Sequence, residues 1–217
     1  MATYFEIHPE NPQTRRMKEI GDALADGAVM LYPTDTVYAI GCAIDNKAAV
    51  QRVRQIKQLA NDKPLTFLCQ SVSNISEYAR VSDAAYRIIR RLIPGPYTFL
   101  LPATKLVPKL VMSPKRKTTG IRVPDRIACQ SLLAQLDRPI ASTSAHLLDE
   151  EGLSLDAEDG AWVDKAKLFD RLAGVVDVIV DDSLEDGVRA STIIDLTDDE
   201  PAIVREGAGI DEALNWV

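Results

Sequence analysis

Residues 14–33, TRRMKEIGDALADGAVMLYP, place an amphipathic segment directly before a short apolar run. Apolar residues recur at three- and four-residue spacing in the first part, which predicts a helix with Thr14 as its N-cap and Gly27 as its stop. The run that follows ends at Pro33 and is typical of a buried strand. A helix that leads straight into a buried strand predicts an α/β or α+β fold.

The same alternation continues along the chain. Further helices are predicted at 46–59, 82–93, 127–136 and 162–174, and further strands at 64–69, 97–103, 118–124, 138–144, 175–181, 191–197 and 201–207. Only an acidic turn separates the last two strands, which favours an antiparallel hairpin and therefore a mixed sheet. Residues 147–160 are polar and without periodicity, so they predict a loop. We expect a single domain over residues 1–217.

Composition points to a globular cytoplasmic protein. The chain has 217 residues, of which 46% are hydrophobic and 26% charged, a balance that disfavours disorder. Its apolar runs are too short to span a membrane, and the N-terminus does not resemble a signal peptide, so no membrane is expected as a partner. Oligomeric state is not indicated by any pattern in the sequence.

Charge is distributed unevenly along the chain. The net charge is −7, yet residues 87–126 hold ten Lys or Arg and one Asp, whereas residues 149–200 hold four basic and seventeen acidic residues. This asymmetry predicts an electropositive face that attracts an anionic ligand. Two solvated faces that offset one another are the alternative interpretation.

The sequence offers no familiar catalytic motif. It has no Walker A loop, no GxGxxG and no GxSxG, so no residue is assigned a catalytic role. Three cysteines without a CxxC pair are expected to be buried and reduced, and two histidines make a dedicated metal site improbable. Mg²⁺ carried by a nucleotide needs few protein ligands and fits this composition.

Hydroxyl and cationic side chains gather where predicted strands begin or end. Thr34–Thr36 and Ser142–Ser144 follow strands, where loops commonly hold ligands, although hydroxyl-bonded turns explain them equally well. In PKRKTTGIRVPD, residues 114–125, strand alternation places Thr118 and Arg122 on one face. Arg122 lies among apolar residues and should therefore pair with a carboxylate or phosphate of the protein or of a ligand.

Seven segments in the same order resemble the YrdC/YciO family, which includes the threonylcarbamoyl-adenylate synthases of transfer RNA modification. The segments are YPTDTVYAIGC, IKQLANDKPL, IPGPYTFLL, TTGIRVPD, ASTSAH, STIIDL and IVREGAG. The YciO branch is the more similar one. The resemblance implies an open, twisted, mixed β-sheet flanked by helices, with a large concave basic cavity. Its synthases join ATP, threonine and bicarbonate by positioned cations, hydroxyls and Mg²⁺, without a protein nucleophile and without a tightly bound cofactor.

Individual residues match the family motifs. The resemblance implies substrate binding by Thr36, Thr118, Arg122, Ser142 and Ser191, and nucleotide binding by Lys57, Lys63, Ser144, His146 and Arg205. Two positions depart from the synthases at the nucleotide end, where Leu59 replaces an arginine and His146 replaces an asparagine. We therefore expect weak synthase activity. The alternative is a translation-related protein without synthase activity that binds double-stranded RNA or tRNA through Lys115, Arg116 and Lys117.

Overall fold

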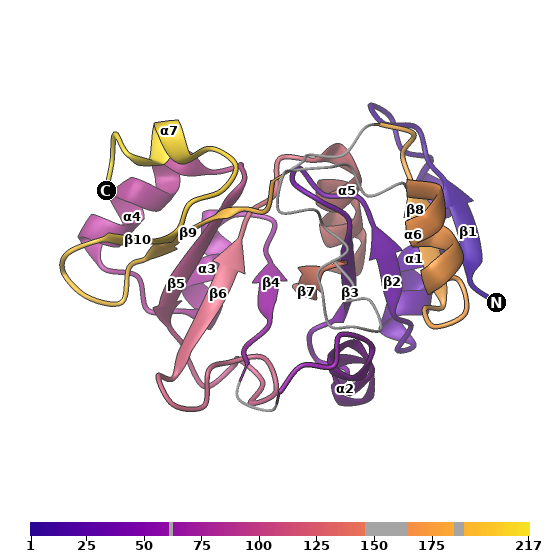
Figure 1. The fold of residues 1–217 in the computed structure, drawn as a ribbon, viewed down its shortest axis with the longest axis horizontal. Coiled ribbons are helices and arrows are strands. Elements are labelled where there is room, and N and C mark those ends of the chain that lie inside the picture. Colours follow the sequence, from indigo (N-terminus) through magenta and orange to yellow (C-terminus); the bar gives the residue numbers. More distant parts are fainter. Residues whose placement is uncertain (61–62, 146–164, 185–188) are drawn as a thin grey trace.

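The computed structural model of the protein describes residues 1–60, 63–145, 165–184 and 189–217. Within these residues one mixed ten-stranded sheet runs through the molecule in the order β1-β8-β2-β3-β7-β4-β6-β5-β9-β10 (Figure 1). Its strands are β1 (Thr3–Glu6), β2 (Met30–Tyr32), β3 (Ala39–Ala43), β4 (Thr66–Leu68), β5 (Tyr97–Pro102), β6 (Thr118–Arg122), β7 (Ile140–Ser144), β8 (Val178–Asp181), β9 (Thr192–Asp195) and β10 (Ala202–Arg205). The open, mixed sheet predicted from the sequence is confirmed, and β9 and β10 form the expected antiparallel hairpin.

Helices cover both faces of this sheet. They are α1 (Thr14–Ala25), α2 (Lys47–Ile56), α3 (Val72–Tyr78), α4 (Asp83–Leu92), α5 (Ile127–Leu136), α6 (Lys165–Leu172) and α7 (Ile210–Ala213). Asn46 and Ser82 cap α2 and α4, because each side chain accepts a hydrogen bond from an amide three residues later. The predicted N-cap of the first helix was wrong: Thr14 is already helical, and Gln13 stands before it without a side-chain bond. Gly27 ends this helix at a φ of 99°, which glycine adopts readily.

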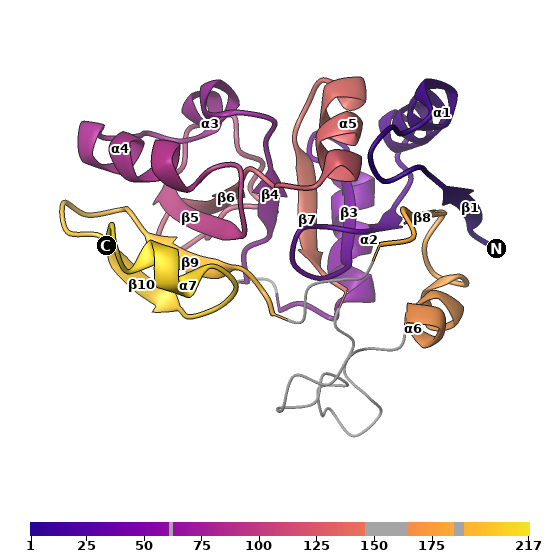
Figure 2. The same cartoon turned by 90° about the horizontal axis from the view of Figure 1, so that it is seen from above.

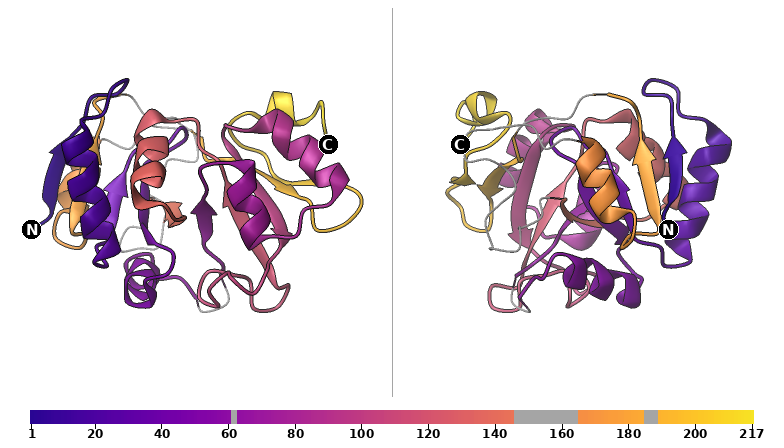
Figure 3. Two further views of the ribbon diagram at one scale, coloured as in Figure 1. Left: turned by 180° about the vertical axis from the view of Figure 1, so that it is seen from behind. Right: turned by 45° about the vertical axis from the view of Figure 1, so that its right-hand side comes forward.

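The hydrophobic core consists of two clusters on opposite faces of the sheet. Helices α1 and α5 lie on the same side of the sheet (Figure 2 and Figure 3), and their apolar faces pack with Tyr32, Leu68 and Ile140. The other cluster combines residues of α2, α3, α4, α6 and α7 with strand residues that include Phe67 and Phe99. Because Phe67 and Leu68 are consecutive in β4, strand alternation assigns these two clusters to opposite faces.

The predicted loop at 147–160 lies outside the described residues. Among the residues that are described, no helix is long and apolar enough to cross a membrane.

Candidate functional site

An open cavity crosses the sheet on the face that carries α1 and α5. It has a volume of about 210 Å³ and is partly open to solvent. Its lining comes from seven strands or their ends, and the polar members are Thr34, Thr36, Thr66, Thr98, Arg122, Ser142, Thr143, Ser144, Ser191 and Arg205. Hydroxyls and two guanidinium groups therefore dominate the polar lining.

Strand alternation explains why the floor of the cavity is polar. In β4 and β5, Phe67 and Phe99 point into the core, so the preceding Thr66 and Thr98 point to the opposite face. Gly120 lies between them in the sheet, and a Cβ there would stand 3.0 Å from Thr66 Oγ1 and 3.3 Å from Thr98 Cγ2. A side chain at this position would therefore crowd both hydroxyl-bearing residues.

Arg122 is buried at the end of β6 and is held by the loop that follows β2. Its Nη1 donates to Thr36 Oγ1 at 2.8 Å, and its Nη2 donates to Asp35 Oδ1 at 2.5 Å. Thr36 in turn lies 3.0 Å from the hydroxyl of Thr34, which donates to the Val37 carbonyl at 2.7 Å. The predicted anion partner of Arg122 is thus present within the protein, and it is Asp35.

Arg205 approaches the same cavity from β10. Its Nη2 donates to both the carbonyl oxygen and Oγ of Ser191 at 2.8 and 3.1 Å, and Ser191 Oγ lies 2.8 Å from Thr98 Oγ1. Burial, and then the positive charge of Arg122, lower the pKa of Arg205 below its ordinary value. The two guanidinium groups therefore repel each other across one cavity, an arrangement that an anion between them would relieve.

A second pair of hydroxyls lies at β7 and includes Ser142 of the lining. Tyr32 Oη and Ser142 Oγ are 2.7 Å apart and buried. Burial raises the pKa of Tyr32 well above its ordinary value, so this phenol is neutral and available only as a hydrogen-bonding group.

Six of the residues assigned from the sequence lie together in the structure. They are the cavity-lining residues Thr36, Arg122, Ser142, Ser144, Ser191 and Arg205. Sequence reasoning missed Asp35 as the partner of Arg122, and it missed Tyr32, Thr66 and Thr98. The signal for the two threonines was available: each precedes a core phenylalanine in a Thr-Phe-Leu triplet.

The remaining assigned residues that the structure describes lie outside the lining. Thr118 begins β6, two residues before Gly120, and is half-buried. Lys57 follows α2 as its C-cap, and Lys63 is exposed before β4. His146 lies outside the described residues. Lys115, Arg116 and Lys117 are exposed on the connection between β5 and β6, and Arg116 reaches Asp195 at 3.5 Å.

Part of the positive charge of residues 87–126 is offset within the fold. Besides Arg122, Arg126 pairs with buried Asp182 at 2.7 Å. Arg91 stacks 3.8 Å from the centroid of the Trp216 ring, a contact that leaves its charge in place. In α2, Arg54 is buried although its side chain is charged. Its guanidinium donates to the carbonyls of Ala60, Lys63 and Leu110, which the helical pattern could not reveal.

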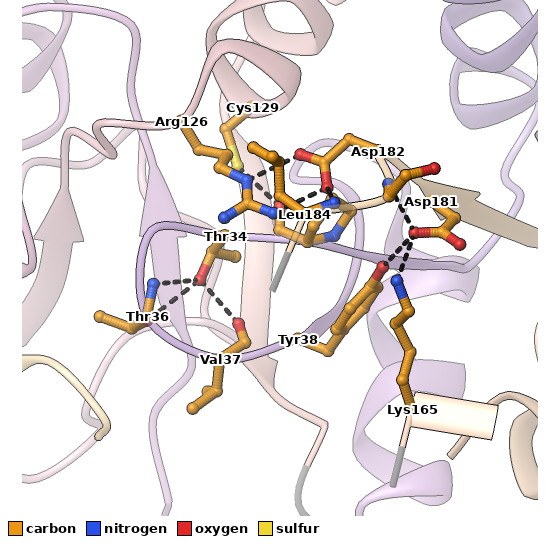
Figure 4. A network of polar contacts seen from close by, with 12 residues as sticks. Thr34, Thr36, Val37, Tyr38, Arg126, Cys129, Lys165, Asp181, Asp182 and Leu184 are labelled. Carbon is orange, nitrogen blue, oxygen red and sulfur yellow. Dashed lines mark hydrogen bonds and ion pairs between the residues drawn. The ribbon is translucent and has the colours of Figure 1, made fainter. Parts of the chain in front are cut away.

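A polar network at the end of β8 borders the loop between β2 and β3 that carries Thr34 and Thr36 (Figure 4). Asp181 accepts hydrogen bonds from the Tyr4 and Tyr38 hydroxyls, from Lys165 Nζ and from the Ser183 amide, at 2.7 to 3.1 Å. Burial opposes ionisation of Asp181, but these hydrogen bonds outweigh it and lower its pKa. Tyr38 follows Val37 of the cavity lining, so the network fixes one end of that loop. No group of three or more metal-binding side chains occurs in the part of the chain that the structure describes.

Comparison with known proteins identifies the family. The Sua5/YciO/YrdC family profile, described as telomere recombination, matches residues 22–207. The uncharacterized protein YciO of Escherichia coli K12 is 40% identical over 209 residues, which cover 96% of this chain and 97% of YciO. The protein therefore belongs to the Sua5/YciO/YrdC family, and it is a YciO-like member. The E. coli YciO crystal structure superposes with a TM-score of 0.86 at 38% identity and covers 98% of this chain and 99% of that one.

Two more distant relatives carry functional names. Threonylcarbamoyl-AMP synthase of Vibrio vulnificus is 33% identical over 134 residues, 60% of this chain and 72% of the synthase. The structure of P. abyssi Sua5 complexed with L-threonine has a TM-score of 0.82 at 23% identity and covers all of this chain and 62% of Sua5. At that identity the likeness to Sua5 is one of fold.

Proposed function

We propose that the cavity binds a threonine-like amino acid beside a nucleotide, and that the protein forms the threonylcarbamoyl-adenylate of its relatives only slowly. The observation that supports this is the position of Arg122 and Arg205 in one hydroxyl-lined cavity, with Asp35 as the carboxylate that pairs with Arg122. Such a cavity suits the carboxylate of an amino acid and the phosphates of ATP, with Mg²⁺ entering as part of the nucleotide substrate.

The width of the cavity lining supports binding of an amino acid beside a nucleotide. Ser142 on β7 and Ser191 beside β9 both line it, and four strand intervals separate these strands. At about 4.8 Å per interval the axes of these two strands stand roughly 19 Å apart. A lining that extends across five adjacent strands is wider than a single amino acid and suits an amino acid beside a nucleotide.

We expect slow turnover because a cation is missing from the segment that should bind the nucleotide. Leu59 precedes the segment that enters the lining at Pro64 and Leu65, and it carries no charge. Arg54 cannot replace the missing guanidinium, because its own is bound to three backbone carbonyls.

Calorimetric titration with ATP and threonine separately, followed by a pyrophosphate-release assay with threonine and bicarbonate, tests the proposal. We expect threonine binding, weak ATP binding and slow pyrophosphate release that requires both co-substrates. A titration that shows no binding of threonine, or none of ATP, would contradict the proposed function.

Leu59→Arg is expected to tighten ATP binding about ten- to a hundredfold, because one charge-assisted hydrogen bond contributes roughly 1.5–3 kcal/mol. Titration of ATP into this variant measures the gain. Leu59→Gln is the matched control, since it adds a polar chain without charge. Equal affinities of the two variants would show that a cation at this position does not contact the nucleotide.

A second candidate function is binding of double-stranded RNA outside the cavity. Lys105, Lys109 and residues 115–117 are all exposed on the connection between β5 and β6. A hydrogen bond from the Leu65 amide to the Val111 carbonyl, 3.0 Å, brings the segment that holds exposed Lys63 alongside. Clustered exposed cations of this kind bind phosphate backbones without reading sequence.

Replacing Lys115, Arg116 and Lys117 together by alanine should weaken binding of a 20-base-pair RNA duplex by about tenfold and flatten its salt dependence, because fewer counterions are released. Fluorescence anisotropy at several salt concentrations measures both quantities.

The matched control removes three exposed cations elsewhere, with Arg15, Arg16 and Lys18 of α1 changed to alanine. If both triple variants lose affinity equally, net charge alone is responsible and the surface around residue 115 has no special part in RNA binding.

A further inference from the structure

The buried ion pair between Arg122 and Asp35 is only half satisfied. Their side chains are 8% and 9% exposed, and a single hydrogen bond joins Nη2 to Oδ1. Nε of Arg122 and Oδ2 of Asp35 are buried and have no hydrogen-bond partner among the described residues. Two charged groups thus each retain one unused hydrogen-bonding atom beside the cavity.

This geometry differs from the arrangement that an arginine and a carboxylate prefer. Two parallel hydrogen bonds between guanidinium and carboxylate would use both unpaired atoms. Here Thr36 holds the guanidinium from its other side, through Nη1, and the pair remains single-bonded. Leaving a charged atom buried without a partner is unfavourable, so the pair gains if either member finds a better one.

An incoming ligand can supply those partners. Arg122 lines the cavity, so a ligand carboxylate can take the guanidinium with two hydrogen bonds and displace Asp35. A simple carboxylate would then leave Asp35 charged, buried and unpaired. A ligand that also carries an ammonium group next to its carboxylate would pair with Asp35 in the same step, and the number of ion pairs would be conserved.

We propose that Asp35 is a specificity-determining residue, which makes the cavity select α-amino acids over simple carboxylates by exchange of ion-pair partners. The inference rests on the proposed function and extends it, because it names the ligand group that Asp35 recognises. It also gives a reason for a carboxylate beside an anion-binding cavity: Asp35 pairs with Arg122 while the cavity is empty and receives the ammonium group when it is filled.

Two ligands with the same carbon skeleton test the idea. Threonine and 3-hydroxybutanoate differ only in the amino group, and calorimetric titration gives the affinity of each. For the unaltered protein we expect threonine to bind at least about 30-fold more tightly, a ratio equivalent to roughly 2 kcal/mol. In Asp35→Asn the ratio should fall to within about threefold, since the displaced side chain no longer carries a charge. Asp35→Glu, which keeps the charge, should retain the preference.

Asp182→Asn serves as the matched control, because it also weakens a buried Arg–Asp pair, in this case the pair of Asp182 with Arg126. Its ratio should equal that of the unaltered protein. Thermal melting of each variant shows that the folded protein is being titrated, and if Asp35→Asn does not fold, Asp35→Glu and the ratio in the unaltered protein still decide.

The outcomes separate the two proposals. A threonine preference that persists in Asp35→Asn, or equal affinities in the unaltered protein, would overturn the role of Asp35 and leave the cavity as an amino-acid site. Failure of the unaltered protein to bind threonine at all would overturn the proposed function and this inference with it.

Discussion

Arg122→Ala is expected to lower the free energy of unfolding by about 3–5 kcal/mol, because it leaves the buried Asp35 carboxylate without a counterion. Thr36 would lose its hydrogen bond from Nη1 as well, so the loop after β2 would lose both of these hydrogen bonds to β6. Urea denaturation at pH 7 measures the loss, and threonine titration should show no binding.

The double variant Arg122→Ala/Asp35→Ala distinguishes charge burial from packing. Removing both charges should recover most of the lost stability, because no buried carboxylate is then left unpaired. Threonine binding should not return, since the guanidinium is still missing. Equal instability of the single and double variants would mean that Arg122 stabilises the fold by packing alone.

Strand pattern made the cavity floor predictable in principle. Thr-Phe-Leu occurs in both β4 and β5, and Gly-Ile-Arg ends β6, so each strand alternates a core residue with a cavity residue. The starts of the helices predicted at 46 and 82 were equally local, and Asn46 and Ser82 cap α2 and α4. Such features depend on residues a few positions apart, which a sequence displays directly.

Pairing between distant segments was not predictable in this way. Asp35 and Arg122 are 87 positions apart and meet only because the sheet brings β6 near the loop after β2. Likewise, the basic stretch 87–126 predicts an electropositive face, but its charge count did not show that Asp35, Asp182 and Asp195 pair with three of its ten cations. Charge counts along a chain omit such contacts, and the inward turn of Arg54 has the same origin.

Asp181→Asn should cost about 2–4 kcal/mol of stability at pH 7, because the amide cannot accept all four hydrogen bonds and leaves Lys165 without its carboxylate. The effect should depend on pH. Since the pKa of Asp181 is lowered from 3.8 in the folded protein, the contribution of the carboxylate is complete above that value and is lost as the pH falls through the folded pKa. Urea denaturation of both proteins at pH 7 and pH 3 gives the two differences to compare.

The difference between the two proteins should therefore shrink at pH 3, because this pH lies below the ordinary pKa of 3.8 and unfolding then takes up a proton at Asp181. Tyr4→Phe and Tyr38→Phe are the controls, because each removes one donor and keeps the charge, and each should cost about 1 kcal/mol at pH 7. A gap between Asp181→Asn and the unaltered protein that is equal at both pH values would show that shape, and not charge, stabilises this junction. A gap that shrinks would show that the charge of Asp181 stabilises this junction. Asp181 joins β1, β8 and α6 to the loop that carries Thr36, so acid should then loosen the border of the cavity before it unfolds the core.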